Sequence, residues 1–186
     1  KKLWATGFHF GDWLALDGDE GGFEGGTEKE FIASAYYFYS TTILAKTCEV
    51  LGKIELFEEY TKLAEEIRKA IIFEYYAESG RLGLKNQTAY ILSLFMDIAP
   101  EYRERTANDF AKLLKKDKNH LKTGFIGTPY ICRALSDNGY NELAYTLLLN
   151  KDLPSWLYAV NMGATTVWER WNSVMPDGKM NPAGMN

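Results

Sequence analysis

A carboxylate close to two tryptophans is the part of this sequence best suited to chemistry. Glu169 directly follows Trp168 and precedes Trp171 by two positions, at the end of the run 163–171. Indole rings exclude water, and their flat apolar faces suit the apolar face of a sugar ring. A carboxylate beside them can act as a general base that activates water. The residue types leave a structural alternative equally open, namely a core tryptophan pair with Glu169 ion-paired to Arg170 or a lysine.

A second candidate is the loop that contains Asp12 and Trp13. It belongs to residues 1–28, which are rich in glycine, acidic and aromatic side chains. Asp17, Asp19, Glu20 and Glu24 crowd the same stretch. Solvated loop acids are the commoner explanation of such crowding. His9 and His120 lack the spacing of a ligand pair, so we expect no metal and no cofactor.

The charge and hydropathy of the sequence exclude several classes of function. The 186 residues carry 21 basic and 25 acidic side chains, a net charge of −4, and contain no basic block. We therefore expect no nucleic-acid partner. The apolar share of 46% is globular, and no run reaches the roughly 20 apolar residues of a membrane span, so no membrane partner is expected. Aromatic residues make up 15%, and their excess is the first indication of a ligand site. The compartment stays open.

The elements that must position these residues are helices in pairs. Residues 28–52 are apolar on most sides, whereas 54–74 carry a single apolar stripe. The same alternation recurs in 87–99 and 101–116, and again in a helix opened by Thr128-Pro129 and a stripe over 140–148. A helix that is apolar all round needs neighbours on both sides. We therefore predict three helical hairpins, each with an inner and an outer member.

Boundary signals and spacing refine this prediction. Thr27 with Glu30 predicts a capping box, and Gly52 and Gly139 predict helix ends. The pair starts are unevenly spaced, which favours an α/α toroid with site-building loops over a regular α-solenoid. After residue 150 we expect an irregular segment, with a short helix from Pro154 and a strand-like or extended run over 163–171.

Six segments together resemble the catalytic domain of bacterial α-L-rhamnosidases, glycoside hydrolase family 78. They are Gly11–Leu14, Asn86–Tyr90, Thr123–Tyr130, Pro154–Tyr158, Gly163–Trp171 and Asn181–Asn186. Each segment is weak alone, but their common order is specific. The resemblance implies an all-α fold, part of an (α/α)₆ barrel. Residues 1–186 would then be a partial domain that lacks its N-terminal helices and extreme C-terminus.

The resemblance also implies an activity and roles for single residues. It implies an inverting hydrolase that removes terminal α-linked L-rhamnose from a rhamnose-containing glycoside or polysaccharide. Glu169 matches the general base and Trp13 a wall of the rhamnose pocket. We expect Asp12, Trp168 and Trp171 to bind substrate as well.

One departure from the family pattern concerns the general acid. The family carries it in an acidic segment with Arg and Trp, upstream of the Gly-Asp-Trp-Leu loop. Nothing before Asp12 matches that segment. We expect the acid in the remainder of the catalytic domain, and these residues alone to be inactive.

Two other functions stay open. One is a related α/α-toroid glycosidase acting on another sugar. The other is a non-catalytic solenoid or carbohydrate-binding module, which would depend on Trp13 and lose nothing on Glu169→Gln. The enzyme would lose turnover on that change while still binding rhamnose.

Overall fold

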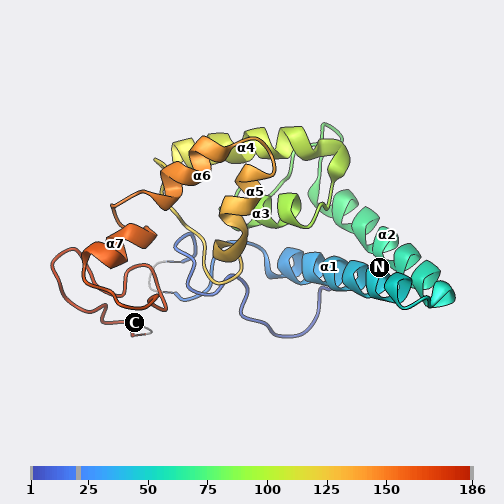
Figure 1. Cartoon of the computed structure of the whole chain (residues 1–186), viewed down its shortest axis with the longest axis horizontal. Coiled ribbons are helices and arrows are strands. Elements are labelled where there is room, and N and C mark those ends of the chain that lie inside the picture. The colour runs from blue at the N-terminus through green and yellow to red at the C-terminus, as the bar shows by residue number, and fades with distance from the viewer. Residues whose placement is uncertain (1, 20–21, 185–186) are drawn as a thin grey trace.

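The computed structural model describes residues 2–19 and 22–184, and these residues are helical with irregular connections. The helices are α1 Lys29–Val50, α2 Ile54–Tyr75, α3 Gln87–Phe95, α4 Arg103–Lys116, α5 Ile131–Ser136, α6 Asn141–Leu148 and α7 Trp156–Asn161, with single 3-10 turns η1 Pro100–Tyr102 and η2 Thr128–Tyr130 (Figure 1). The described residues contain isolated β-bridges but no strand. None of their helices is both long and apolar enough to cross a membrane. The predicted all-α class is confirmed.

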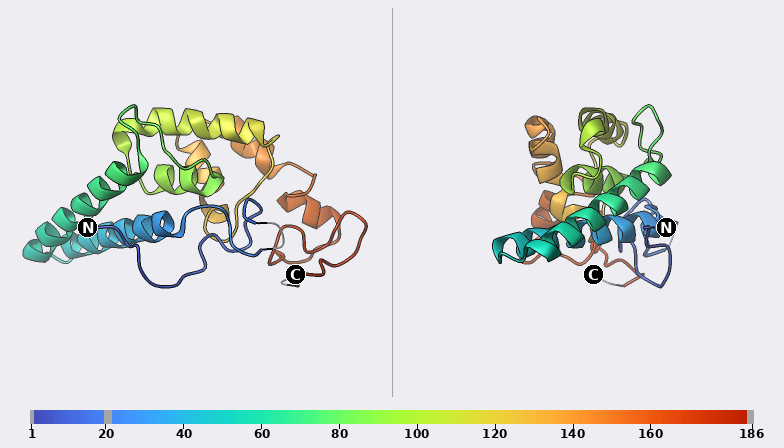
Figure 2. Two further views of the ribbon diagram at one scale, coloured as in Figure 1. Left: turned by 180° about the vertical axis from the view of Figure 1, so that it is seen from behind. Right: turned by 90° about the vertical axis from the view of Figure 1, so that its right-hand side faces the viewer.

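The helices form three consecutive hairpins, as the alternating pattern predicts. α1 packs along α2, α3 along α4, and α5 along α6. α3 also contacts α1 and α5, so the first helix of the middle hairpin contacts the first helices of the other two. Figure 2 shows the same pairing from behind and from the side. The first helix of each hairpin is thus the inner member, and the second covers it.

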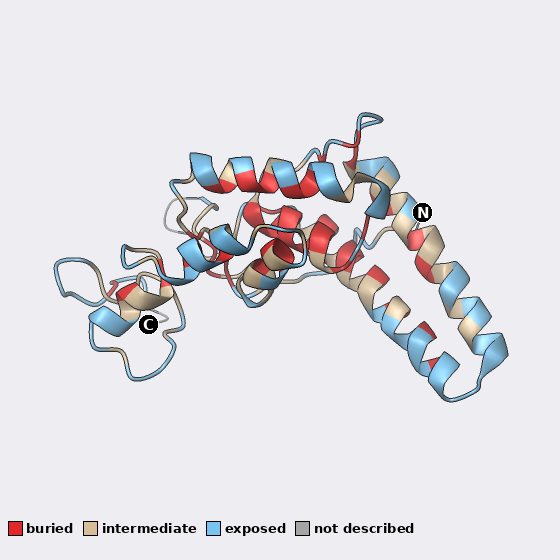
Figure 3. Ribbon diagram, turned by 45° about the horizontal axis from the view of Figure 1, so that its top comes forward, coloured by how far each residue is buried: buried red, intermediate tan, exposed pale blue. Residues whose placement is uncertain are grey.

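Burial follows the predicted difference between inner and outer helices. In α3 every residue from Gln87 to Leu94 is buried, so this helix is enclosed on all sides (Figure 3). In α4 the buried residues follow one stripe, which includes Thr106, Phe110 and Leu114. α3 is therefore the centre of the core.

α1 departs from its predicted enclosure. Its first half is buried around Phe31 and Phe38, but Ile43, Leu44 and Val50 in its second half are exposed. Figure 3 shows the far end of the α1–α2 hairpin projecting from the body with mostly exposed residues. An inner helix that is apolar all round thus keeps one uncovered face among the described residues.

Two of the three predicted helix boundaries hold. Gly52 and Gly139 follow helix ends with φ of +66° and +84°, a conformation that glycine adopts without strain. The predicted capping box is wrong. Glu28 is the residue at the N-cap position of α1, and it makes no side-chain capping hydrogen bond. The Thr27 side chain is instead buried, where its hydroxyl has no hydrogen-bond partner among the described residues.

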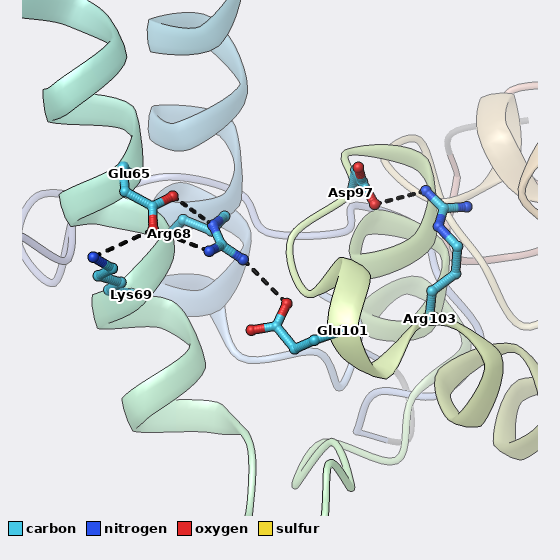
Figure 4. A network of polar contacts seen from close by, with 6 residues as sticks. All are labelled: Glu65, Arg68, Lys69, Asp97, Glu101 and Arg103. Carbon is cyan, nitrogen blue, oxygen red and sulfur yellow. Dashed lines mark hydrogen bonds and ion pairs between the residues drawn. The ribbon is translucent and has the colours of Figure 1, made fainter.

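Ion pairs connect the first hairpin to the second at the surface (Figure 4). Arg68 of α2 contacts Glu65 on its own helix at 2.7 Å and Glu101 of η1 at 3.2 Å. The hydrogen bond from the Arg68 guanidinium lowers the pKa of the Glu65 carboxyl below its usual value. Arg103 at the start of α4 pairs with Asp97 at 2.8 Å. The Arg68–Glu101 pair thus joins α2 to the turn between α3 and α4, and the Arg103–Asp97 pair lies within the second hairpin.

The segment after α7 is irregular, as predicted, and its run 163–171, predicted to be strand-like or extended, forms no strand. Residues 165–167 are exposed, and the nearest ladder contact is a single bridge between Val174 and Met180. β-branched and aromatic residues form a strand only when another strand pairs with them. No such strand is present in the described part of the chain, and the run forms bends instead.

Candidate active site

Three loops from distant parts of the sequence meet beside α7. The Phe125 amide donates to the Trp13 carbonyl oxygen at 3.0 Å, and the Leu16 amide donates to the Lys122 carbonyl oxygen at 2.9 Å. The Trp171 indole Nε1–H donates to the Thr123 carbonyl oxygen at 2.7 Å. The loop before α1, the loop before η2 and the segment after α7 are therefore joined directly.

The cavity at this junction contains three of the predicted site residues. Its volume is about 150 Å³. Its lining residues are Leu14, Gly124, Phe125, Thr128, Pro129, Trp156, Val167, Trp168, Glu169, Arg170 and Trp171. A second cavity of about 280 Å³ adjoins it and shares several of the same walls, Trp168 and Trp171 among them. The lining is mainly apolar and aromatic, and Glu169 and Arg170 are its charged residues.

The Glu169 side chain is exposed, and its carboxylate is unoccupied by the described residues. No hydrogen bond or ion pair to it exists within residues 2–19 and 22–184. The neighbouring Arg170 guanidinium points elsewhere, because it donates to Asn172 Oδ1 at 2.8 Å and to the Gly184 carbonyl oxygen at 3.2 Å. The structure thus disfavours the ion-paired alternative among the described residues.

The two indoles beside Glu169 do not form a core pair. Trp171 packs edge to face on Trp156, with ring centroids 5.3 Å apart. Trp168 packs edge to face on Tyr158 at 6.4 Å. Both tryptophans are half-buried. Each indole is therefore anchored by a different ring of α7, which leaves both as walls of the cavity.

Trp13 lies beside the cavity walls without being one of them. Its ring contacts Phe10 at 5.1 Å and Phe23 at 5.4 Å between centroids. The Arg170 guanidinium carbon lies 6.0 Å from the centre of the Phe23 ring, and the next residue, Leu14, lines the cavity. The loop of Trp13 therefore reaches the segment of Glu169, as expected if both build one site.

Asp12 does not occupy its expected position. Its side chain is fully buried and lines neither cavity. The amides of Gly124, Ile126 and Gly127 donate to its carboxylate at 3.0, 2.7 and 3.4 Å, and the Thr88 hydroxyl donates as well. Burial raises the pKa of the Asp12 carboxyl, while the four hydrogen bonds act in the opposite direction. In this structure the Asp12 carboxylate binds the protein's own loop, whereas the sequence predicts that it binds substrate.

The acidic first loop is held by internal contacts. Asp17 accepts hydrogen bonds from the Gly26 amide at 2.9 Å and the Asn86 side chain at 2.8 Å. Glu24 pairs with Lys29 at 2.7 Å, whereas Glu20 lies outside the described residues. Within the described ranges no three His, Cys, Asp or Glu side chains are grouped so as to hold a metal ion.

The sequence did not identify the wall supplied by η2 and the loop before it. Phe125, Thr128 and Pro129 line the cavity although none carries a chemical signal. The two glycines of this loop were the available signal, because each permits a close approach. A Cβ on Gly124 would collide with the Trp13 carbonyl oxygen, and one on Gly127 with the Thr88 hydroxyl.

The fold consists of helical hairpins whose inner helices contact α3. Their loops build a cavity lined by indoles and one acid. Together these features are typical of an α/α-toroid glycosidase domain. The model of the bacterial alpha-L-rhamnosidase 6 hairpin glycosidase domain matches residues 1–186, and the chain belongs to this family. The predicted family and the predicted (α/α)₆ class are confirmed.

Individual relatives agree with this assignment. The chain is 39% identical over 178 residues to an alpha-L-rhamnosidase of Streptomyces avermitilis, covering 95% of this chain and 16% of the relative. It is 37% identical over 180 residues to one from Formosa agariphila, covering 95% and 19%. The chain thus spans less than a fifth of the length of these two relatives.

Two solved structures of alpha-L-rhamnosidases are also similar to this chain. The crystal structure of the Streptomyces avermitilis alpha-L-rhamnosidase complexed with L-rhamnose has a TM-score of 0.85 at 36% identity, covering 94% of this chain and 16% of that chain. The alpha-L-rhamnosidase of Aspergillus terreus has a TM-score of 0.91 at 31% identity, covering 96% and 21%.

Proposed function

We propose that this chain supplies the base-bearing part of an active site that hydrolyses terminal α-L-rhamnosyl linkages with inversion. The observation that carries the proposal is the Glu169 carboxylate, which pairs with none of the described residues and lines a cavity walled by Trp168 and Trp171. The likeness to alpha-L-rhamnosidases, including one complexed with L-rhamnose, supports the choice of sugar.

Glu169 acts as the general base in this reaction. It takes a proton from a water molecule while the water oxygen forms a bond to the anomeric carbon. The bond from that carbon to the leaving oxygen breaks, and a second carboxylic acid donates its proton to the leaving oxygen. Attack from the side opposite the leaving group inverts the configuration. The two carboxyl groups must then lie about 6.5–9.5 Å apart, which leaves room for the water.

The walls of the cavity fit a deoxy sugar. Trp168, Trp171 and Phe125 present apolar rings, and Val167 adds an apolar side chain. Rhamnose carries a methyl group where most hexoses carry a hydroxymethyl group, so its burial against these rings is favourable. We propose that Trp13, held by its aromatic neighbours, extends this surface around the sugar.

The general acid comes from the remainder of the catalytic domain, and residues 1–186 form only part of it. The exposed apolar side chains on the far half of α1, Ile43, Leu44 and Val50, support this division. An inner helix with an uncovered apolar face is completed when a further hairpin packs against it. We refer to this chain together with those further hairpins as the complete domain.

The test of this function uses the complete domain and a panel of aryl glycosides. We expect hydrolysis of an aryl α-L-rhamnoside, with the β-anomer of rhamnose as the first product in a proton NMR time course. Preference for another glycoside would favour the alternative of a related toroid glycosidase. Tight rhamnose binding without any turnover would favour a carbohydrate-binding module, and the α-anomer as first product would refute inversion.

A further inference from the structure

The start of α3 holds the loops of the site by the side chains of three consecutive residues. Asn86 donates to Asp17 of the first loop at 2.8 Å. Gln87 donates to the His120 carbonyl oxygen at 2.9 Å and accepts from the Lys122 amide at 3.0 Å. Thr88 donates to Asp12, again in the first loop. These loops therefore converge on the most enclosed helix of the core.

The Thr88–Asp12 contact is the most buried of these connections. Thr88 is 2% exposed and Asp12 is 0% exposed. The same Asp12 carboxylate accepts the amides of Gly124, Ile126 and Gly127. Hydrogen bonds to a charged group are stronger than neutral ones, and burial shields them from competing water. One carboxylate thus fixes both the first loop and residues 124–127.

The loop fixed in this way is a wall of the cavity and a support for the base. Phe125 lies between the residues that Asp12 binds, and it lines the cavity. The carbonyl oxygen of Thr123 accepts the hydrogen bond from the Trp171 indole, two residues from Glu169. A continuous path of contacts therefore runs from α3 through Asp12 and this loop to the segment that carries the base.

We propose that Thr88 and Asp12 are positioning residues. They fix the position of the cavity wall around Phe125 and, through Trp171, the position of the Glu169 carboxylate. This inference rests on the proposed rhamnosidase function. Neither residue touches the sugar. Their part is to keep the loop of Phe125 and the indole of Trp171 fixed while the base takes its proton. A displacement of about 1 Å at a reacting group is enough to lower a rate by about a hundredfold.

The test compares three variants of the complete domain. Thr88→Val removes the hydroxyl at nearly constant shape, and Thr88→Ser restores it. Thr41→Val is the matched control, because Thr41 is also buried and its hydroxyl donates within α1, to the Tyr37 carbonyl oxygen at 2.7 Å. We expect Thr88→Val to lower kcat for an aryl α-L-rhamnoside at least tenfold with KM changed less than threefold. Thr88→Ser and Thr41→Val stay within twofold of the wild type.

A second readout does not depend on activity. Hydrogen exchange of the amides in 124–127 should become at least tenfold faster in Thr88→Val and remain unchanged in Thr41→Val. Wild-type kcat and exchange in Thr88→Val would overturn the proposal, and so would an equal loss of kcat in Thr41→Val. A wild-type domain without rhamnosidase activity would refute the proposed function, while the exchange measurement would still decide whether Thr88 holds this loop.

Discussion

Gly124→Ala tests whether the close approach of the site loops determines local stability. A Cβ on Gly124 would collide with the Trp13 carbonyl oxygen and lie 2.6 Å from the Ala15 amide nitrogen. These obstacles are backbone atoms, so no side chain can turn away to make room. The two loops must separate by about 1.5 Å to restore ordinary van der Waals contact.

The cost follows from the hydrogen bonds that this separation breaks. The Phe125 amide loses its hydrogen bond to the Trp13 carbonyl oxygen, which is 3.0 Å long in the wild type. The Gly124 amide loses its hydrogen bond to the Asp12 carboxylate, which is also 3.0 Å long. A neutral hydrogen bond contributes about 1 kcal/mol and one to a charged group about 2 kcal/mol. We therefore expect the free energy of local opening to fall by about 3 kcal/mol, so that amide exchange accelerates about a hundredfold.

The assay is hydrogen exchange of the peptides that cover 11–16 and 122–128, followed by mass spectrometry. Gly83→Ala is the control, because a Cβ there meets only the Tyr75 carbonyl oxygen at 3.3 Å. It should leave exchange in both peptides unchanged. Wild-type exchange rates in Gly124→Ala would refute the reasoning that these loops are fixed against each other.

Two further predictions concern the ion pairs and the indole anchor. Arg68→Met removes the partner that lowers the pKa of Glu65, so it should cost about 0.5–1 kcal/mol of unfolding free energy at pH 7. This difference from the wild type persists above the usual pKa of 4.5 and disappears as pH falls through the lowered value, which urea unfolding at a series of pH values would measure. A difference that grows in acid would contradict the assignment. Trp171→Phe keeps a ring but loses the hydrogen bond to Thr123, so kcat of the complete domain should fall at least fivefold, whereas wild-type kcat would argue against the anchor.

The fold was largely predictable because the apolar residues of a helix recur with the helical period in the sequence. The apolar residues on nearly all sides of α3 and the single apolar stripe of α4 correctly predicted an inner and an outer helix. Gly52 marked a real helix end, since a positive φ is a local property that favours glycine. Thr27 failed as a cap because tertiary packing buried its side chain, which no local pattern records.

The site was predictable only where its chemistry is concentrated in one segment. Glu169 and its two indoles stand out by residue type, and the structure places all three on one cavity. The opposite wall around Phe125 depends on hydrogen bonds between loops, which have no period and no fixed spacing. The contacts of Asp12 were not predictable for the same reason. A buried carboxylate that four donors occupy has the same residue type as one that faces a ligand.

The central claim, that Glu169 is the general base, is tested most directly by Glu169→Gln in the complete domain. The control is Glu142→Gln, an exposed glutamate on α6. Measured with an aryl α-L-rhamnoside, kcat of Glu169→Gln should fall by about a hundredfold or more, while the dissociation constant for rhamnose from calorimetry stays within about threefold. Glu142→Gln should match the wild type in both. Wild-type turnover by Glu169→Gln would contradict the account.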